Sequence, residues 1–196
     1  MVDKVQISQK ETVPLAVNPK KFILWLFIVS ILMMFAGITS GYIVKRADGG
    51  WMEFPLPFVF WVNTGIILLS SITVQWAYRM AKKDNLTNVK IALLLTTLLG
   101  FAFLAGQEYA REELQEMGVF FGYKGSNPAG SYLYLFGGLH AFHLGTGLIF
   151  LLIVLFSSLK HKVHSKNMIQ IELCATYWHF LDVLWIYLFV FLLVNH

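Results

Sequence analysis

Five long apolar stretches constrain the fold of this 196-residue chain more than any other feature of its sequence. Each can cross a hydrocarbon core of about 30 Å as a helix that rises about 1.5 Å per residue. Hydrophobic residues make up 57% of the chain and charged residues only 13%, against about 25% charged in an average soluble domain. The sequence therefore predicts an all-α integral membrane protein, a bundle of five transmembrane helices at residues 22–44, 58–78, 91–109, 132–159 and 173–194.

The charges between these stretches predict the orientation and the domain organisation. Basic residues gather on the side of the amino terminus, at Lys4, Lys10, Lys20, Lys21, Arg79, Lys82, Lys83, Lys90, Lys160, Lys162 and Lys166. The other side has fewer, at Lys45, Arg46, Arg111 and Lys124, diluted by acidic residues. Because lysine and arginine accumulate in cytoplasmic loops, the amino terminus is predicted inside and the carboxyl terminus outside. Residues 1–21 are expected to form a polar cytoplasmic arm, and residues 22–196 one membrane domain.

The same composition excludes several classes of function. The net charge of +4 reflects the loop bias, and no separate basic face indicates a nucleic-acid partner. Cys174 is the only cysteine, so an intrachain disulfide, a CxxC pair and an iron–sulfur site are excluded. The spans share no repeat, and an odd number of them argues against a duplicated transporter half.

The last apolar stretch contains a histidine and an aspartate, two residues that a lipid-facing helix does not need. His179 and Asp182 are three residues apart and share a helix face. An ionisable group inside the membrane is costly unless a partner or a polar cavity receives it. His143 in the preceding stretch lies about 16 Å in from its start, and the pair lies about 14 to 18 Å in from the opposite side. We therefore predict a polar lock in which His179 and Asp182 meet His143.

The preceding stretch also carries His140, one turn from His143, and this raises the question of haem or copper. One haem iron takes axial ligands on opposite faces, so two histidines on one helix face cannot both serve it. A haem between His143 and His179 is conceivable, but a hydrogen-bonded structural pair is the favoured interpretation. No metal is therefore assigned to the chain.

The second stretch is rich in hydroxyl and amide side chains, namely Asn63, Thr64, Ser70, Ser71, Thr73 and Gln75. Such groups bond across helices or back to their own carbonyls, each contributing about 1 kcal/mol or less. Asn63 is the costliest to bury, so it is predicted to have a specific interhelical partner. In the first stretch, Gly37 and Gly41 form a small-xxx-small pair that predicts close helix contact.

Two glutamates lie near the ends of spans. Glu108 is placed near the outer boundary, where it either pairs with Arg111 or reaches water, or instead takes an interior role with a histidine. Glu172, near the cytoplasmic interface, could receive a lysine, a lipid headgroup or a neighbouring subunit. Neither position alone indicates catalysis.

Taken together, these motifs resemble subunit III of the haem–copper terminal oxidases, in its short five-helix form. YWHFLDVLW at 177–185 is similar to the carboxyl-terminal signature of that family almost letter for letter, and Glu172 falls at the spacing of its upstream glutamate. GLHAFHL at 138–144 resembles its histidine pair, and GQEY at 106–109 its acidic end to the third helix of the short form. The Asn-Thr pair, the Leu-Leu-Ser-Ser run and the Trp-Ala exit of the second stretch resemble the family as well.

The resemblance also has a departure. Many members place an acidic residue directly after a serine in the first span, whereas this chain has Ser30 followed by Ile31. Any role of that carboxylate, such as assisting proton supply, cannot be carried over. The seven-helix members carry two further helices ahead of this core, which the short form does without.

The resemblance implies an accessory subunit without redox centres in an aerobic respiratory cytochrome c oxidase that reduces O₂ to water. Haem and copper would belong to partner subunits. The chain would flank subunit I, within reach of subunit II and small subunits, hold structural phospholipids and support proton uptake. It is expected in the bacterial cytoplasmic membrane, with a respiratory supercomplex as a further possible partner. Its polar positions Asn63, Glu108, His140, His143, Glu172, His179 and Asp182 would be structural, lipid-related or proton-related rather than catalytic.

Alternatives stay open from the sequence alone. A quinol oxidase subunit III and a nitric-oxide reductase accessory protein belong to the same family. A free-standing proton-coupled transporter would use Glu108, His143, His179 and Asp182 as its path. The sequence does not reveal the electron donor, the haem type or the pumping stoichiometry.

Overall fold

The computed structural model describes residues 18–51, 55–122, 127–159 and 168–195, and all five long elements within them are helices. They are α1 (Pro19–Ala47), α2 (Val59–Lys82), α3 (Leu86–Glu116), α4 (Pro128–Leu159) and α5 (Ile169–Asn195). Each is long and apolar enough to cross a membrane, which confirms the prediction of an all-α, five-span bundle. Most of the predicted arm, together with Lys4, Lys10, Lys124, Lys160, Lys162 and Lys166, lies outside the described residues.

The helices run past the predicted spans for local reasons. The Asn18 side chain accepts a hydrogen bond from the Lys20 amide, with Pro19 following in the first turn, so α1 begins before its apolar residues. Beyond Tyr109, α3 continues through the charged segment 111–116, because arginine, glutamate, leucine and glutamine are good helix formers. Hydropathy alone does not detect such extensions.

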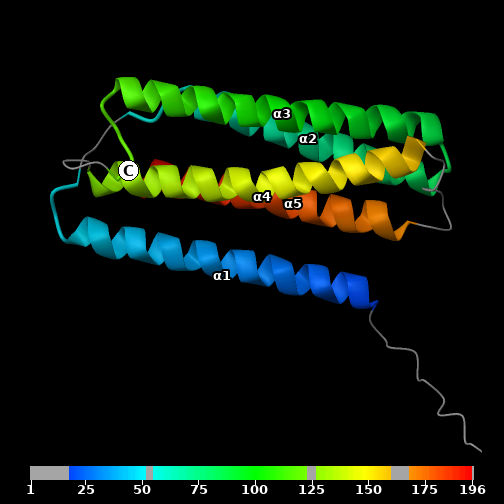
Figure 1. The fold of residues 1–196 in the computed structure, drawn as a ribbon, viewed down its shortest axis with the longest axis horizontal. Coiled ribbons are helices and arrows are strands. Elements are labelled where there is room, and N and C mark those ends of the chain that lie inside the picture. Colours follow the sequence, from blue (N-terminus) through cyan, green and yellow to red (C-terminus); the bar gives the residue numbers. More distant parts are fainter. Residues whose placement is uncertain (1–17, 52–54, 123–126, 160–167, 196) are drawn as a thin grey trace, which may run out of the picture.

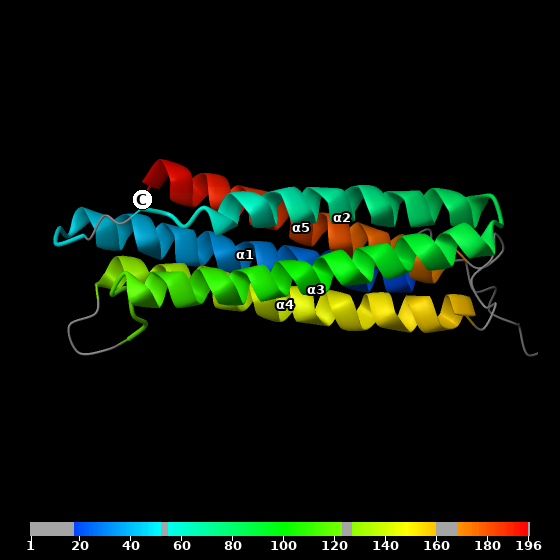
Figure 2. The same cartoon turned by 90° about the horizontal axis from the view of Figure 1, so that it is seen from above.

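The five helices lie side by side along one long axis, with neighbours in sequence running in opposite directions (Figures 1 and 2). Helices α4 and α5 lie between α1 on one side and the α2–α3 hairpin on the other (Figure 1). α5 packs against α1, α2 and α4, and it is the most buried of the five spans. We call the end that holds Asn195 the carboxyl-terminal end of the bundle, and the opposite one the amino-terminal end. Which end faces the cytoplasm stays a prediction from the loop charges.

Glycines of α3 and α4 make room for the centre of α5. A Cβ on Gly100 would lie 2.9 Å from the Trp178 ring and 2.8 Å from Leu148. A Cβ on Gly147 would lie 2.9 Å from Leu181. Trp178 is fully buried at this level. The predicted glycine contact in α1 is wrong for Gly37, which has open space around it.

One face of α1 packs on α4 and α5 and is fixed at both ends by polar groups. Tyr42 donates its hydroxyl to the Asn195 carbonyl at 2.7 Å, and its ring packs on Trp51, Tyr132 and Phe191. At the other end Lys21 pairs with Glu172 of α5. Between these ends the buried face is largely apolar, and the opposite face is exposed and hydrophobic, as a lipid-facing surface is.

Candidate functional site

A seam of hydrogen bonds joins α5 to α2. The His179 ring has Nδ1 2.7 Å from Ser71 Oγ and Nε2 3.1 Å from Gln75 Oε1. A neutral ring fits this arrangement, because Nε2–H donates to the amide oxygen while Nδ1 accepts from the hydroxyl. His179 is therefore bound to one neighbouring helix through both of its nitrogens.

Two tryptophans of the signature extend the seam in both directions. Trp178 donates its indole N–H to Ser70 Oγ at 3.0 Å, and Trp185 donates to Thr64 Oγ1 at 3.1 Å. With the Ser71 and Gln75 bonds, they confirm that side chains of the second span bond across helices. They also explain why ring N–H groups and small hydroxyls face each other here, since a buried indole needs a partner.

The predicted lock between His143 and the His179/Asp182 pair is wrong. His143 Nδ1 lies 2.7 Å from the carbonyl of Leu139 in its own helix, and its ring packs edge-on against Phe35 of α1. Tyr177 is the α5 residue that reaches this region, with its hydroxyl 2.9 Å from Thr146 Oγ1. Residues two apart on a helix point about 200° apart, so Tyr177 faces α4 while His179 faces α2. Depth along the helix suggested the lock, but direction around the helix rules it out.

Asp182 lies one turn beyond His179 and is 2% exposed. Neither carboxylate oxygen has a hydrogen bond of good geometry within the described residues. Ser71, which bonds to His179, also lies beside the carboxyl group. A buried carboxyl group in such surroundings is costly to keep charged.

Asn63 and His140 are buried polar residues in the half of the bundle near its carboxyl-terminal end. Asn63 is 1% exposed, and it packs so closely against Gly106 of α3 that a Cβ there would lie 2.1 Å from Oδ1. His140 is fully buried between the rings of Phe103 and Trp185. Among the described residues, the Asn63 amide and both His140 nitrogens have no hydrogen-bond partner. The partner predicted for Asn63 is therefore a close backbone contact instead of a hydrogen bond.

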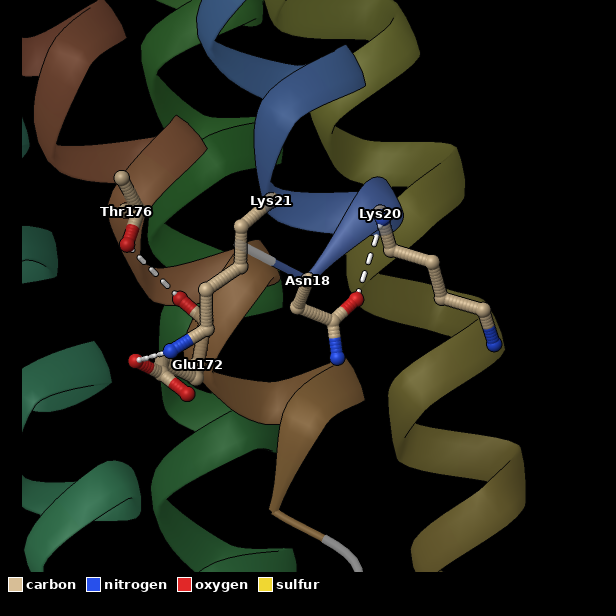
Figure 3. Close-up of polar contacts among 5 residues, drawn as sticks. All are labelled: Asn18, Lys20, Lys21, Glu172 and Thr176. Carbon is tan, nitrogen blue, oxygen red and sulfur yellow. Dashed lines mark hydrogen bonds and ion pairs between the residues drawn. The ribbon is translucent and has the colours of Figure 1, made fainter. Parts of the chain in front are cut away.

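The two glutamates each take a basic partner. Lys21 Nζ lies 2.6 Å from Glu172 Oε1, and this ion pair joins the first turns of α1 and α5 (Figure 3). The Glu172 carbonyl also accepts a bond from Thr176 Oγ1. Glu108 pairs with Arg111 one turn along α3, with both side chains about half exposed. Among the partners considered for Glu172, the structure shows a lysine, Lys21. Of the roles considered for Glu108, it shows the pairing with Arg111.

The pairings needed by two alternative functions are not formed. The transporter path required Glu108, His143, His179 and Asp182 to connect, but the first three bond to separate partners on α3, α4 and α2. A haem between His143 and His179 would have to displace the Ser71 and Gln75 bonds. Within the part of the chain that the structure describes, no group of three or more histidine, cysteine, aspartate or glutamate residues could hold a metal ion.

Ile31, which stands where many relatives have an acid, is 3% exposed. It lies on the α1 face that packs against α4 and α5, together with Ile28 and Phe35. An apolar side chain suits this contact, so the position contributes packing in this chain.

Sequence reasoning did not single out Ser71, Gln75 or Tyr177 as bonding partners of the site. Their spacing held the signal for α2, because Ser71 and Gln75 are four residues apart and share a helix face. Tyr177 has no comparable signal, since its hydroxyl reaches α4 only through the placement of α5.

Comparison with known proteins matches most of the chain, including the signature. The family model described as cytochrome c oxidase subunit III matches residues 50–195. The cytochrome c oxidase subunit 3 of Corynebacterium diphtheriae is 33% identical over 172 residues, which cover 84% of this chain and 82% of that protein. The rat protein of the same name is 32% identical over 184 residues, and the mouse protein 30%, each alignment covering 84% of this chain but 65% of the relative. This chain belongs to the cytochrome c oxidase subunit III family.

Proposed function

We propose that the chain is the accessory subunit III of an aerobic respiratory cytochrome c oxidase, and that it carries no redox centre itself. The match of the family model to residues 50–195 carries this proposal. Haem and copper reside in partner subunits, and the chain flanks subunit I within the membrane. Its part in O₂ reduction is to stabilise the catalytic subunit, to hold lipid and to support proton uptake.

The internal bonding of the chain fits a supporting role. The polar side chains of its signature are used to fix helix to helix, as His179 with Ser71 and Trp178 with Ser70 illustrate. A long apolar surface is left exposed, including Trp25, Met33, Phe58 and Ile72. Such a surface suits contact with acyl chains or with another membrane subunit.

A bacterial cytoplasmic membrane is the proposed location. The match to the cytochrome c oxidase subunit 3 of a bacterium, Corynebacterium diphtheriae, supports it. Cytochrome c is the proposed electron donor of the complex, because the relatives are named for it. Subunit II and small subunits are further proposed neighbours.

Deletion of the chain tests the proposal. The purified oxidase should keep its haem absorbance while its activity decays faster during turnover. Resupplying the wild-type chain should restore the durability. Equal durability with and without the chain would contradict a stabilising role.

Affinity purification under mild detergent separates the alternatives. A tagged chain should bring down haem-bearing subunits, one of which should carry a copper-binding soluble domain if the donor is cytochrome c. A complex without that domain would indicate a quinol oxidase or a nitric-oxide reductase instead. A chain that migrates alone would contradict oxidase membership.

A further inference from the structure

A cavity of about 120 Å³ lies between α2, α3, α4 and α5 in the half of the bundle near its carboxyl-terminal end. Its walls include Phe60, Gln107, Phe136, Trp185 and Leu188. At roughly 30 Å³ for each molecule, it has room for several waters. The family assignment gives this space no role.

Unpartnered polar groups gather around this cavity. Gln107 Nε2, on its wall, is buried and has no hydrogen-bond partner among the described residues. The same holds for both amide atoms of Asn63 and both ring nitrogens of His140. A buried polar atom without a partner is costly, so nearly all such atoms in proteins bond to another protein group or to an ordered water. Three side chains in this half of the bundle therefore have buried polar atoms without a hydrogen-bond partner among the described residues.

Asn63 and His140 do not line the cavity, but each lies close to a residue on its wall or next to one. The His140 ring centroid is 5.3 Å from that of Trp185, a wall residue. On α4, Gly137 and Ala141 line the cavity and are close to His140 along the chain. Asn63 packs on Gly106, the neighbour of Gln107 in the chain. Gln107 is therefore the unpartnered side chain that a water in the cavity can reach directly.

The cavity also has a polar entrance. The Glu108–Arg111 ion pair lies on its wall, with both side chains about half exposed. Tyr134, also on the wall, turns its hydroxyl to the Val119 carbonyl at 2.8 Å. Charged groups at this level keep the mouth hydrated, since their own solvation requires water.

We propose that this cavity is an internal water site, entered past Glu108 and Arg111, in which the buried Nε2 of Gln107 binds the first water. The ligand is water, and the apolar part of the wall excludes charged solutes. The site places water beside Trp185, whereas the α2–α5 seam is bonded directly from side chain to side chain.

Radiolytic footprinting of the full chain, with its co-purifying subunits in lipid nanodiscs, tests the proposal. A millisecond X-ray pulse makes hydroxyl radicals from bound water, and mass spectrometry locates the oxidised side chains. The chain supplies its own matched control on α5, because Trp185 lines the cavity at 3% exposure and Trp178 is away from it at 1%. Trp185 should be oxidised at least about fivefold faster than Trp178, and should stay so with a bulk radical scavenger, because bound water lies beside it.

Equal protection of the two tryptophans would overturn the proposal, as would a Trp185 signal that the scavenger abolishes. An acyl chain in the cavity in place of water would give equal protection of the two tryptophans. In a second arm, Gln107→Leu removes the donor at the mouth and should lower the Trp185 rate about threefold, because the first water loses its partner. Thr97→Val, which removes only a bond to the carbonyl of Leu93 within α3, should leave the rate unchanged. An unaltered Trp185 rate in Gln107→Leu would overturn the place of Gln107 in the site.

Discussion

His179 Nδ1 lies 2.7 Å from Ser71 Oγ, across the interface between α5 and α2. The bond ties the middle of the family signature to the hydroxyl-rich second span. The signature therefore helps to hold α5 against α2, and the stability lost when the bond is removed can be measured.

Ser71→Ala should destabilise the folded subunit. The substitution leaves a His179 nitrogen without its partner, and we expect a loss of about 1 kcal/mol, within the range of interhelical bonds in membranes. Retention of the subunit during a detergent or denaturant titration of the complex measures this. Thr97→Val is the control, since that hydroxyl bonds only to the Leu93 carbonyl of its own helix. A double-mutant cycle with His179→Ala that gives no coupling energy would contradict a direct bond.

Asp182→Asn should keep or increase stability. The carboxyl oxygens have no hydrogen bond of good geometry within the described residues, and an uncharged amide of the same shape avoids the cost of a buried charge. His179→Leu should instead lose about 1–3 kcal/mol, because it leaves Ser71 and Gln75 unpaired. Yield and subunit stoichiometry of both variants, measured side by side, decide the matter. Loss of assembly in Asp182→Asn alone would contradict this expectation and show that the carboxyl group has an essential partner.

Gly100→Ala should destabilise the bundle centre by about 1–3 kcal/mol through overpacking. The added carbon would meet both Trp178 and Leu148 at less than 3.0 Å. Gly65→Ala in α2 has nothing within 4 Å and should be neutral or stabilising by up to about 1 kcal/mol, as alanine is the better helix former. Thermal unfolding of the two variants in the same detergent gives the comparison. Equal melting temperatures would refute the contact.

Lys21→Ala should weaken the attachment of α1 by only about 0.2–1 kcal/mol, because the ion pair with Glu172 is partly exposed. The loss should shrink as ionic strength rises. The exchange Lys21→Glu with Glu172→Lys should restore part of it. Full restoration is not expected, since a lysine in the first turn of α5 opposes the helix dipole. Proteolysis of α1 at low and high salt measures the effect, and a salt-independent loss would count against an ionic contact.

The spans and the polar character of the site were predictable from the sequence, because length and apolar content determine what can cross a bilayer. The partners of His179 were not predictable, and the predicted lock with His143 is wrong. Depth along a helix follows from counting residues, but the direction of His179 depends on where α2 and α4 lie around α5. Nor could the sequence rank its glycines: Gly37 has the conventional spacing yet no neighbour, whereas Gly100 receives a tryptophan. Only the assembled bundle brings these partners together.

The α2–α5 seam also restricts motion. Its bonds pair Thr64 with Trp185, Ser70 with Trp178 and Ser71 with His179, at matched positions along two antiparallel helices. A slip of one helical turn, about 5.4 Å, would break all of them together. Helix α5 and the α2–α3 hairpin should therefore move as a single rigid body. Helix α1 packs on α4 and α5 through a largely apolar face, so it is the element that can shift most readily against this body.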